Sequence, residues 1–566
     1  MSLLAKGVSR DMNVNAQPLR LHDARSNKSG FLAATLGTLT FAAATCSGLT
    51  PTQDKTGPIW PTQGWQTSTP EEQGMDSKEL AKVIDFGAAR FLSSTGATPS
   101  SQLDSLLIIR HEKIVAEAYY APYAAGILHQ VNSVTKAITS TLIGIACKDG
   151  LLDSPNHKVL EFFDRHEIGN LDDRKEAITI QNLLDMTSGI GWSELGLEGT
   201  PNSSVSELAR TDDWIRFILD RPMWTAPGLD FNYNSGNQHL LSAILTKVSG
   251  MSTLEYAKAK LFEPLGITDF YWWHDPQGIT DGGFGLFLQP RDMAKIGYLY
   301  LHNGKWEGKQ LLPSTWIDKV NHATIDMHLG QELRYSNCFW ALPEKHAYMA
   351  VGYCGQVIMV FPELDVVAVA TGRANFSLNE FADLVSRSVK QDTSFPVDPT
   401  SVRLLAEKIA EASTEKTTEV GPTSNTAATI SGKVYHFPPN EINVKSLSLF
   451  LTGPDQRYEI EAYGNGTDSA SRLTGPIGLD GFYQKGQLTD QGANNPVFSG
   501  PPRVRAINAV KGTWVDDTTF VVDWRVLGIA NSPEQRWTLS FNGNKLNVRA
   551  QLGGRPEISI QGQTGG

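Results

Sequence analysis

Two side chains that could carry out acyl transfer lie one helical turn apart early in the chain. Ser133 and Lys136 begin the stretch SVTKAITSTLIG, in which apolar residues recur at the spacing of a buried helix. A serine hydroxyl needs a base because it barely ionises at neutral pH, and a lysine that loses solvation has a lowered pKa and can act as that base. The pattern predicts a helix that starts at Ser133, stops near Gly150 and carries both side chains on one face.

An ordinary helix start explains the same residues without any chemistry. Ser133 would cap the helix, and Lys136 would extend its amine to water. The Ser-x-x-Lys spacing is weak evidence by itself, because it occurs again at Ser413 and Lys416 in a polar segment where both side chains are expected to be solvated. The choice between the two interpretations depends on the rest of the chain.

Two other stretches could complete a site around the serine. Tyr-Asn-Ser at 233–235 lies in a loop rich in glycine and asparagine, just before an amphipathic helical pattern. Tyr-Cys-Gly at 353–355 precedes QVIMVF, an apolar stretch that predicts a strand. Neither stretch is specific alone, and their order along the chain is what gives them weight.

Residues 60–390 resemble the serine β-lactamase-like superfamily, which includes the penicillin-binding DD-peptidases and in which these three motifs occur in the same order. The resemblance is nearest to class C β-lactamases, β-lactamase-like esterases and 6-aminohexanoate-dimer hydrolases. Supporting phrases are LLDMTSGIGW, LFEPLGITDFYWW and GGFGLFLQPRDMAKIGYLYL. The resemblance implies an α+β fold of the β-lactamase/transpeptidase type, an antiparallel sheet flanked by helices with a helical subdomain.

The resemblance also implies roles for individual residues. Ser133 would attack a carbonyl carbon and form an acyl-enzyme, with Lys136 and Tyr233 sharing the role of general base. Tyr233 would then protonate the leaving group. The backbone N–H groups of Ser133 and Gln356 would form the oxyanion hole, and Ser235 would orient Lys136 or the substrate.

Two departures from the superfamily pattern bear on the substrate. Ser235 stands where β-lactamases carry asparagine, and the third motif, with Tyr353 and Gly355 expected at the substrate, has no lysine or histidine to face a carboxylate. Both departures are more like 6-aminohexanoate-dimer hydrolases and some esterases, so a small molecule or short peptide with a linear amide, peptide or ester bond is expected. A DD-peptidase or class C-like β-lactamase is the alternative. A non-catalytic binding or sensor protein on the same fold is the alternative from another class.

Composition and the remaining motifs exclude other classes. The net charge of -11 and the lack of a basic run argue against a nucleic-acid partner. The 12 histidines are scattered and no His-Glu-x-x-His occurs, so neither a metal nor another cofactor is expected. No Gly-x-Ser-x-Gly is present for a Ser-His-Asp hydrolase. Cys338 and Cys354 flank a predicted turn, and whether they form a disulfide stays open.

The N-terminal segment predicts export. FLAATLGTLTFAAATC follows basic residues and suits the apolar core of a secretory signal peptide, although it is too short to span a bilayer. Residues 1–46 are therefore interpreted as a leader and residues 47–70 as a tether, which places the protein in the periplasm or outside the cell. Lipid modification at Cys46 and a disordered tail are the alternatives, and no other membrane contact is expected.

The order of the predicted elements gives the domain organisation. Strands are expected near 105–120 and again near 335–372, with helices between them, so one antiparallel sheet would be built from both ends of residues 71–390. Residues 391–430 are polar and are interpreted as a linker that contains one helix. Residues 431–566 alternate in polarity and predict a separate all-β accessory domain, either a barrel or a sandwich.

Overall fold

The computed structural model describes residues 60–565, except residues 90, 93–98, 198–199, 330–331, 464–471, 488, 493–502, 531, 533 and 554–555. The predicted leader (1–46), its candidate lipidation site at Cys46 and the first part of the tether lie outside the described residues. Across the part of the chain that is described, no helix combines the length and apolar character needed to cross a membrane.

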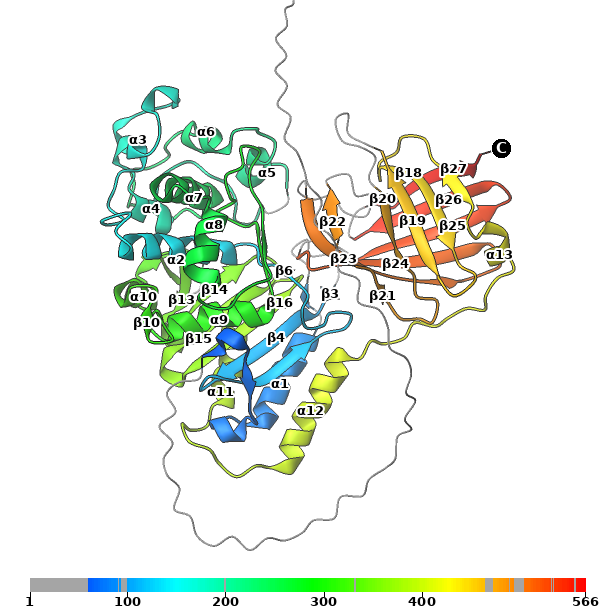
Figure 1. Cartoon of the computed structure of the whole chain (residues 1–566), viewed down its shortest axis with the longest axis horizontal. Coiled ribbons are helices and arrows are strands. Elements are labelled where there is room, and N and C mark those ends of the chain that lie inside the picture. Colours follow the sequence, from blue (N-terminus) through cyan, green and yellow to red (C-terminus); the bar gives the residue numbers. More distant parts are fainter. Residues whose placement is uncertain are drawn as a thin grey trace, which may run out of the picture. The chain divides into compact units, whose positions relative to one another are not determined.

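A mostly antiparallel sheet organises the first two thirds of the chain (Figure 1). Its strands, in spatial order, are β1 (Gln66–Thr67), β5 (Lys113–Tyr119), β4 (Leu103–Arg110), β16 (Val366–Gly372), β15 (Gln356–Phe361), β14 (Ala347–Gly352), β13 (Phe339–Leu342), β12 (Arg334–Ser336) and β11 (Ile325–Asp326). The antiparallel pairing of β4 with β16 confirms that both ends of the helical segment contribute to one sheet.

The central strands are buried on both faces, which explains why their sequences are almost continuously apolar. Leu107 and Ile109 of β4 join one hydrophobic cluster, whereas Leu106 and Ile108 join another on the opposite face. The first cluster holds α2 (Val134–Lys148), α7 (Ser235–Ser249), α9 (Pro290–Leu301) and α10 (Ser314–Asn321), and the second holds α1 (Ser77–Ala88), α11 (Leu378–Ser388) and α12 (Pro399–Ser413). Helices therefore cover both faces of the sheet.

The helical subdomain lies between α2 and the second group of strands in the sequence. Its other helices are α3 (Asp173–Ala177), α4 (Ile180–Leu184), α5 (Ser204–Leu208), α6 (Trp214–Leu219) and α8 (Thr253–Ala257). A small sheet has the order β6 (His129–Gln130), β8 (Leu286–Leu288) and β7 (Tyr271–Trp272), and its strand β6 lies just before α2 in the chain. Short separate hairpins are β2 (Phe91–Leu92) with β3 (Pro99–Ser101) and β9 (Lys305–Trp306) with β10 (Lys309–Gln310).

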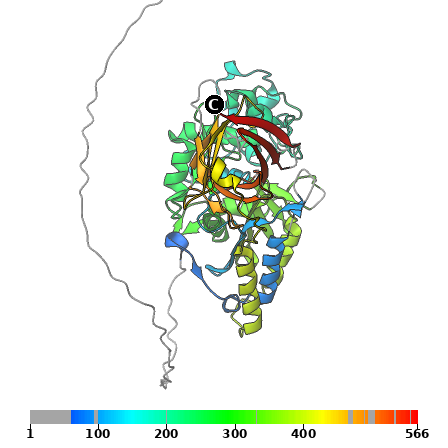
Figure 2. The ribbon, with the colours of Figure 1, turned by 90° about the vertical axis from the view of Figure 1, so that its right-hand side faces the viewer.

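The structure moves two of the predicted segment boundaries. Trp60 and Trp65 both make edge contacts with the ring of Tyr298, and β1 pairs with β5, so the end of the predicted tether (47–70) is part of the domain. The predicted linker (391–430) contains α12, which lies beside α1 in both views (Figures 1 and 2) and packs into the same cluster. In both segments the packing contacts are made by a few apolar side chains within a polar stretch, such as Trp60 and Trp65 in the first and Leu405 in the second.

The C-terminal region is an all-β, nearly closed barrel-like sheet. Its order is β20 (Arg472–Pro476), β19 (Arg457–Ala462), β18 (Val444–Phe450), β17 (Val434–His436), β27 (Ile558–Thr564), β26 (Lys545–Leu552), β25 (Gln535–Asn542), β24 (Thr519–Leu527), β23 (Arg503–Trp514) and β21 (Gln484–Lys485), with β22 (Thr489–Gly492) on β23. The alternating residues Trp537, Leu539 and Phe541 of β25 are buried together in one core, as the alternation in polarity predicts. The helix α13 (Thr426–Ile430) also packs there, ahead of the predicted start at residue 431.

The barrel core is continuous with the preceding region. Leu128 and Phe287 pack into it, and the Gln130 N–H donates to the carbonyl of Gly528 at 2.7 Å. The described residues of both regions belong to one compact unit. The barrel therefore touches the short sheet that leads into α2.

Candidate active site

A sharp turn places Ser133 at the start of α2. Asn132 adopts a left-handed conformation (φ 47°), which asparagine tolerates better than most residues. Its Nδ2 donates to the carbonyl of Tyr353 at 2.8 Å and so ties this turn to the end of β14. The third sequence motif is thereby brought to the first.

Ser133 and Lys136 are hydrogen-bonded to each other, and this contradicts the interpretation as an ordinary helix start. Lys136 Nζ donates to Ser133 Oγ at 2.8 Å and to the carbonyl of Gly283 at 2.9 Å. Lys136 is only 1% exposed, so its amine does not reach water. Ser133 makes no side-chain capping bond to the helix, so its hydroxyl is not occupied in holding the backbone.

Burial tunes the amine for proton transfer. Desolvation lowers the pKa of Lys136, and the nearby carboxylates of Glu194 and Asp281 oppose this shift without cancelling it. Cys338 also faces the amine, and burial raises the pKa of its thiol to about 12, so it adds no charge at neutral pH. The result is an amine that gives up its proton more readily than an exposed lysine.

Tyr233 completes the cluster predicted from the sequence. Its ring centroid lies 4.9 Å from Lys136 Nζ, and the side chain is 6% exposed. Asn234 caps α7 by accepting a hydrogen bond from the Asn237 N–H, and this cap fixes the backbone that carries the tyrosine. Half-buried Trp340 packs edge-on against Tyr233, with ring centroids 6.4 Å apart.

Ser235 is held by a residue that the sequence interpretation missed. Its Oγ donates to Glu194 Oε1 at 2.5 Å, and its backbone N–H donates to Glu194 Oε2 at 2.8 Å. Trp192 Nε1 donates to the same Oε2 at 2.7 Å. The one available signal was the position of Glu194 two residues after the end of the phrase LLDMTSGIGW, since a glutamate in a loop is otherwise unremarkable.

Gly352, which directly precedes the third motif, packs against the turn that carries Ser133. A Cβ on Gly352, the last residue of β14, would lie 2.3 Å from the carbonyl of Val131 and 3.1 Å from the backbone nitrogen of Ser133. Gly355 instead packs against Ala374, whose carbonyl lies 2.5 Å from the corresponding Cβ position. The glycine that allows close approach to the serine is therefore Gly352.

The remaining predicted residues of this motif lie in or beside the same turn. Tyr353 offers its carbonyl to Asn132, as described above. Gln356 begins β15 opposite Gly352, and its buried side-chain amide donates to the carbonyls of Cys354 (3.1 Å) and Gly372 (2.7 Å). The side chain of Gln356 thus holds the turn, while its backbone lies across the strand pair from Gly352.

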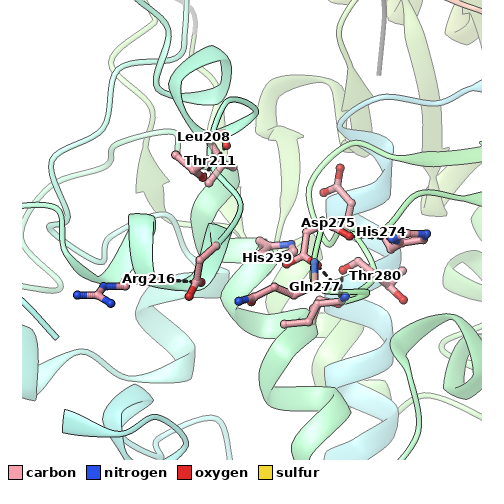
Figure 3. Close-up of polar contacts among 12 residues, drawn as sticks. Leu208, Thr211, Arg216, His239, His274, Asp275, Gln277 and Thr280 are labelled. Carbon is pink, nitrogen blue, oxygen red and sulfur yellow. Dashed lines mark hydrogen bonds and ion pairs between the residues drawn. The ribbon is translucent and has the colours of Figure 1, made fainter. Parts of the chain in front are cut away.

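A buried polar loop supports the carbonyl that receives Lys136. Asp275 accepts hydrogen bonds from His239 Nε2 (3.0 Å) and from the backbone N–H groups of Gln277 (2.9 Å) and Ile279 (2.8 Å), as Figure 3 shows in part. Farther along the loop, Asp281 Oδ1 accepts from the Gly283 N–H at 2.7 Å. These bonds fix the Gly283 peptide, whose carbonyl orients Lys136.

Neither a metal site nor a disulfide is found in this part of the structure. Over the described residues, His, Cys, Asp and Glu side chains do not gather in groups of three or more that could hold a metal ion. Cys338 and Cys354, whose pairing the sequence leaves open, are both free thiols. The hairpin of β13 and β14 predicted between them is present.

Comparisons with known proteins show which family the chain resembles. A protein-family model described as Beta-lactamase matches residues 96–384, just over half of the chain. The 6-aminohexanoate-dimer hydrolase of Paenarthrobacter ureafaciens is 24% identical over 286 residues, 47% of this chain and 71% of that protein. Protein flp of Staphylococcus aureus (strain COL) is 31% identical over 140 residues, 25% of this chain and 27% of that protein. An octameric penicillin-binding protein homologue from Pyrococcus abyssi superposes with a TM-score of 0.43 at 17% identity, covering 85% of this chain and 98% of that one.

Proposed function

This chain belongs to the β-lactamase family, and from that premise we propose that it hydrolyses an ester or linear amide bond through an acyl-enzyme on Ser133. The observation that carries the proposal is the 2.8 Å hydrogen bond between Lys136 Nζ and Ser133 Oγ, made by an amine that is almost completely buried. Burying a lysine lowers the stability of the folded protein, because an uncompensated charge is strongly disfavoured away from water. The amine lies beside a hydroxyl that has no capping role, which supports Lys136 as the base and Ser133 as the nucleophile.

The first half-reaction follows from this arrangement. Neutral Lys136 accepts the hydroxyl proton as Ser133 Oγ bonds to the carbonyl carbon, and the carbonyl π electrons move to oxygen. The Ser133 N–H and a second backbone donor from the turn 352–356, for which the sequence predicts Gln356, stabilise that oxyanion at about 3 kcal/mol per donor. The absence of a side chain at Gly352 leaves room for the oxygen next to the Ser133 nitrogen.

The intermediate then collapses to the acyl-enzyme. The carbonyl re-forms as the bond to the leaving group breaks, and the leaving alcohol or amine takes a proton from Tyr233, which Lys136 replaces from its ammonium. Water then attacks the carbonyl carbon of the ester and passes a proton to Lys136, with the carbonyl electrons moving to oxygen. The carbonyl re-forms as the bond from that carbon to Ser133 Oγ breaks, and Oγ takes the proton back from Lys136. Release of the acid restores the free hydroxyl.

The substrate we propose has no carboxylate next to the bond that is cleaved. The third motif supplies Tyr353, Cys354 and Gly355, none of which is a cation that could bind a carboxylate. Tyr233, Phe231 and half-buried Trp340 form an aromatic group beside Lys136, and aromatic rings suit an apolar acyl chain. The similarity to a 6-aminohexanoate-dimer hydrolase supports linear amides as well as esters.

The test is intact-mass spectrometry of the full chain after mixing with p-nitrophenyl butyrate, a linear 6-aminohexanoate dimer and benzylpenicillin in parallel, next to Ser133→Ala. We expect turnover of the ester or amide, and a transient adduct that Ser133→Ala does not form. An adduct only with penicillin would instead favour a penicillin-binding or β-lactamase role. Hydrolysis that is equal in Ser133→Ala, or no adduct and no turnover with any substrate, would overturn the proposal.

A further inference from the structure

Glu194 is a buried carboxylate that the steps above do not use. Its three hydrogen-bond donors are the Ser235 hydroxyl, the Ser235 backbone N–H and Trp192 Nε1, at 2.5, 2.8 and 2.7 Å. The residue is 9% exposed, so these contacts replace most of its hydration. Ser235 in turn is the first residue of α7 and lies two residues from Tyr233. Glu194 therefore holds the backbone that carries the tyrosine.

The set of partners fits an ionised carboxylate. Two of the three are N–H groups, which can only donate, and a carboxylate accepts at both oxygens without needing an acceptor of its own. Hydrogen bonds to a charged acceptor are stronger than neutral ones, which suits a group with little access to water. The negative charge is thus fixed in place by Trp192 and Ser235.

Glu194 also acts electrostatically on the amine at the centre of the site, since its charge opposes the lowering of the Lys136 pKa by burial. Lys136 contacts the Ser133 hydroxyl, the Gly283 carbonyl and the ring of Tyr233. The titratable groups that act on its pKa are Glu194, Asp281 and Cys338. Asp281 holds the backbone of its own loop, because its Oδ1 accepts hydrogen bonds from two backbone N–H groups there. Glu194 is hydrogen-bonded to the first residue of α7 and also acts electrostatically on the amine.

We infer that Glu194 is a positioning residue of the proposed reaction, which fixes Ser235 and the start of α7 beside Tyr233 and keeps a negative charge opposite the Lys136 ammonium. The inference rests on the proposed acyl transfer and adds a residue to it. Two effects follow that can be separated. The hydrogen bonds determine where Tyr233 lies, and the charge determines the pH at which Lys136 loses its proton.

The charge is tested with Glu194→Gln, because the amide has nearly the same shape and can still accept from Trp192. Removing the negative charge makes the Lys136 ammonium less stable, so its pKa falls. Lys136 must be neutral to act as base, and the acid limb of the kcat/KM profile therefore moves to lower pH, by about one pH unit. The matched control is Glu263→Gln, at an exposed glutamate paired with Lys258 on the surface, which leaves the profile in place.

The positioning is tested with Glu194→Asp, which keeps the charge and shortens the reach to Ser235. We expect the acid limb to stay in place and kcat to fall about ten-fold, since a small displacement of a catalytic group is costly. A merely structural role for Glu194 predicts the opposite pattern for Glu194→Gln, namely a lower yield of folded protein with an unchanged pH profile. That result overturns the inference. If Glu194→Gln does not fold, the inference is overturned instead by a kcat of Glu194→Asp that equals that of the parent protein.

The failure of this inference is distinguishable from failure of the proposed function. If activity survives in Ser133→Ala, the proposed acyl-enzyme on Ser133 is refuted. If activity depends on Ser133, but neither kcat nor the pH profile changes in the Glu194 variants, only the role of Glu194 is refuted.

Discussion

The spacing Ser-x-x-Lys occurs at the start of α2 and at the end of α12, with different outcomes. Ser133 precedes α2, and Lys136 lies one turn into the helix, buried and bonded to the hydroxyl. Ser413 is the last residue of α12, and its hydroxyl donates back to the carbonyl of Ala410 at 2.9 Å. Lys416 follows the helix, and both it and Ser413 are exposed.

The difference shows that this spacing brings a serine hydroxyl and a lysine amine into contact only in the right structural setting. At the start of a helix, residues three apart share a face, and the helix dipole favours negative charge on the hydroxyl oxygen. At the end of a helix, the second residue falls outside the regular backbone. Burial also distinguishes the two lysines, because desolvation lowers the pKa of Lys136, whereas Lys416 is exposed.

The largest expected effect comes from the two serines. Ser133→Ala should lower kcat/KM for a p-nitrophenyl ester by about a thousand-fold or more, because it removes the nucleophile. Ser413→Ala should leave kcat/KM unchanged. Steady-state kinetics of both variants and the parent protein measure this difference in kcat/KM. A comparable loss in the two variants would show that the two serines do not differ in function.

The two lysines should differ by a smaller factor. Lys136→Met should lower kcat/KM about a hundred-fold, the range expected for a lost general base, whereas Lys416→Met should have no effect. In the parent protein activity should rise with pH as Lys136 loses its proton, and this limb should lie below the ordinary pKa of lysine because burial lowers it. A pH–rate profile identical in the parent and in Lys136→Met would contradict the assignment.

A pair of glycines sharpens the comparison between the active-site region and the barrel. Gly352→Ala places a methyl group 2.3 Å from the Val131 carbonyl and next to the Ser133 nitrogen, so the turn before α2 must shift. We expect kcat to fall between about ten- and a hundred-fold with the fold retained. Gly486→Ala in the barrel meets only ordinary contacts (3.5 Å and beyond) and should be silent, as circular dichroism and kinetics can verify.

The smallest expected effect concerns stability. Ser133 makes no capping bond, so Ser133→Ala should change the free energy of unfolding by less than about 0.5 kcal/mol. Asp76 caps α1, the neighbour of α12, by accepting from the Lys78 and Glu79 N–H groups, and Asp76→Ala should cost about 1 kcal/mol. Urea denaturation followed by fluorescence measures both, and a large loss in Ser133→Ala would show that the serine supports the helix after all.

Much of the fold could be predicted because the pattern is local. The apolar runs of β4 and β16, the cap at Asp76 and the Asn-Gly-Asn turn before β26 each appear in a few consecutive residues, and the structure has all of them. The ends of the predicted tether and linker were misplaced because Trp60, Trp65 and Leu405 are isolated apolar residues in polar sequence. Their packing partners lie far away in the chain.

The site was predictable in part for the same reason. Ser133, Lys136 and Tyr233 belong to short motifs, and the structure brings them together. Glu194 and Gly352 carry no motif of their own. Their importance arises from contacts with Ser235 and with the Ser133 nitrogen, which no spacing in the sequence reveals.

The sequence by itself determined the family, the order of the motifs and the helix on which a hydroxyl and an amine share a face, because these depend on residue type and on the period of a helix. Only the tertiary structure decided that the amine is buried beside the hydroxyl, that a glutamate holds Ser235, and that Gly352 approaches Ser133. Burial and close approach are made by residues distant in the chain, and the desolvation that lowers the pKa of Lys136 exists only once they have packed around it.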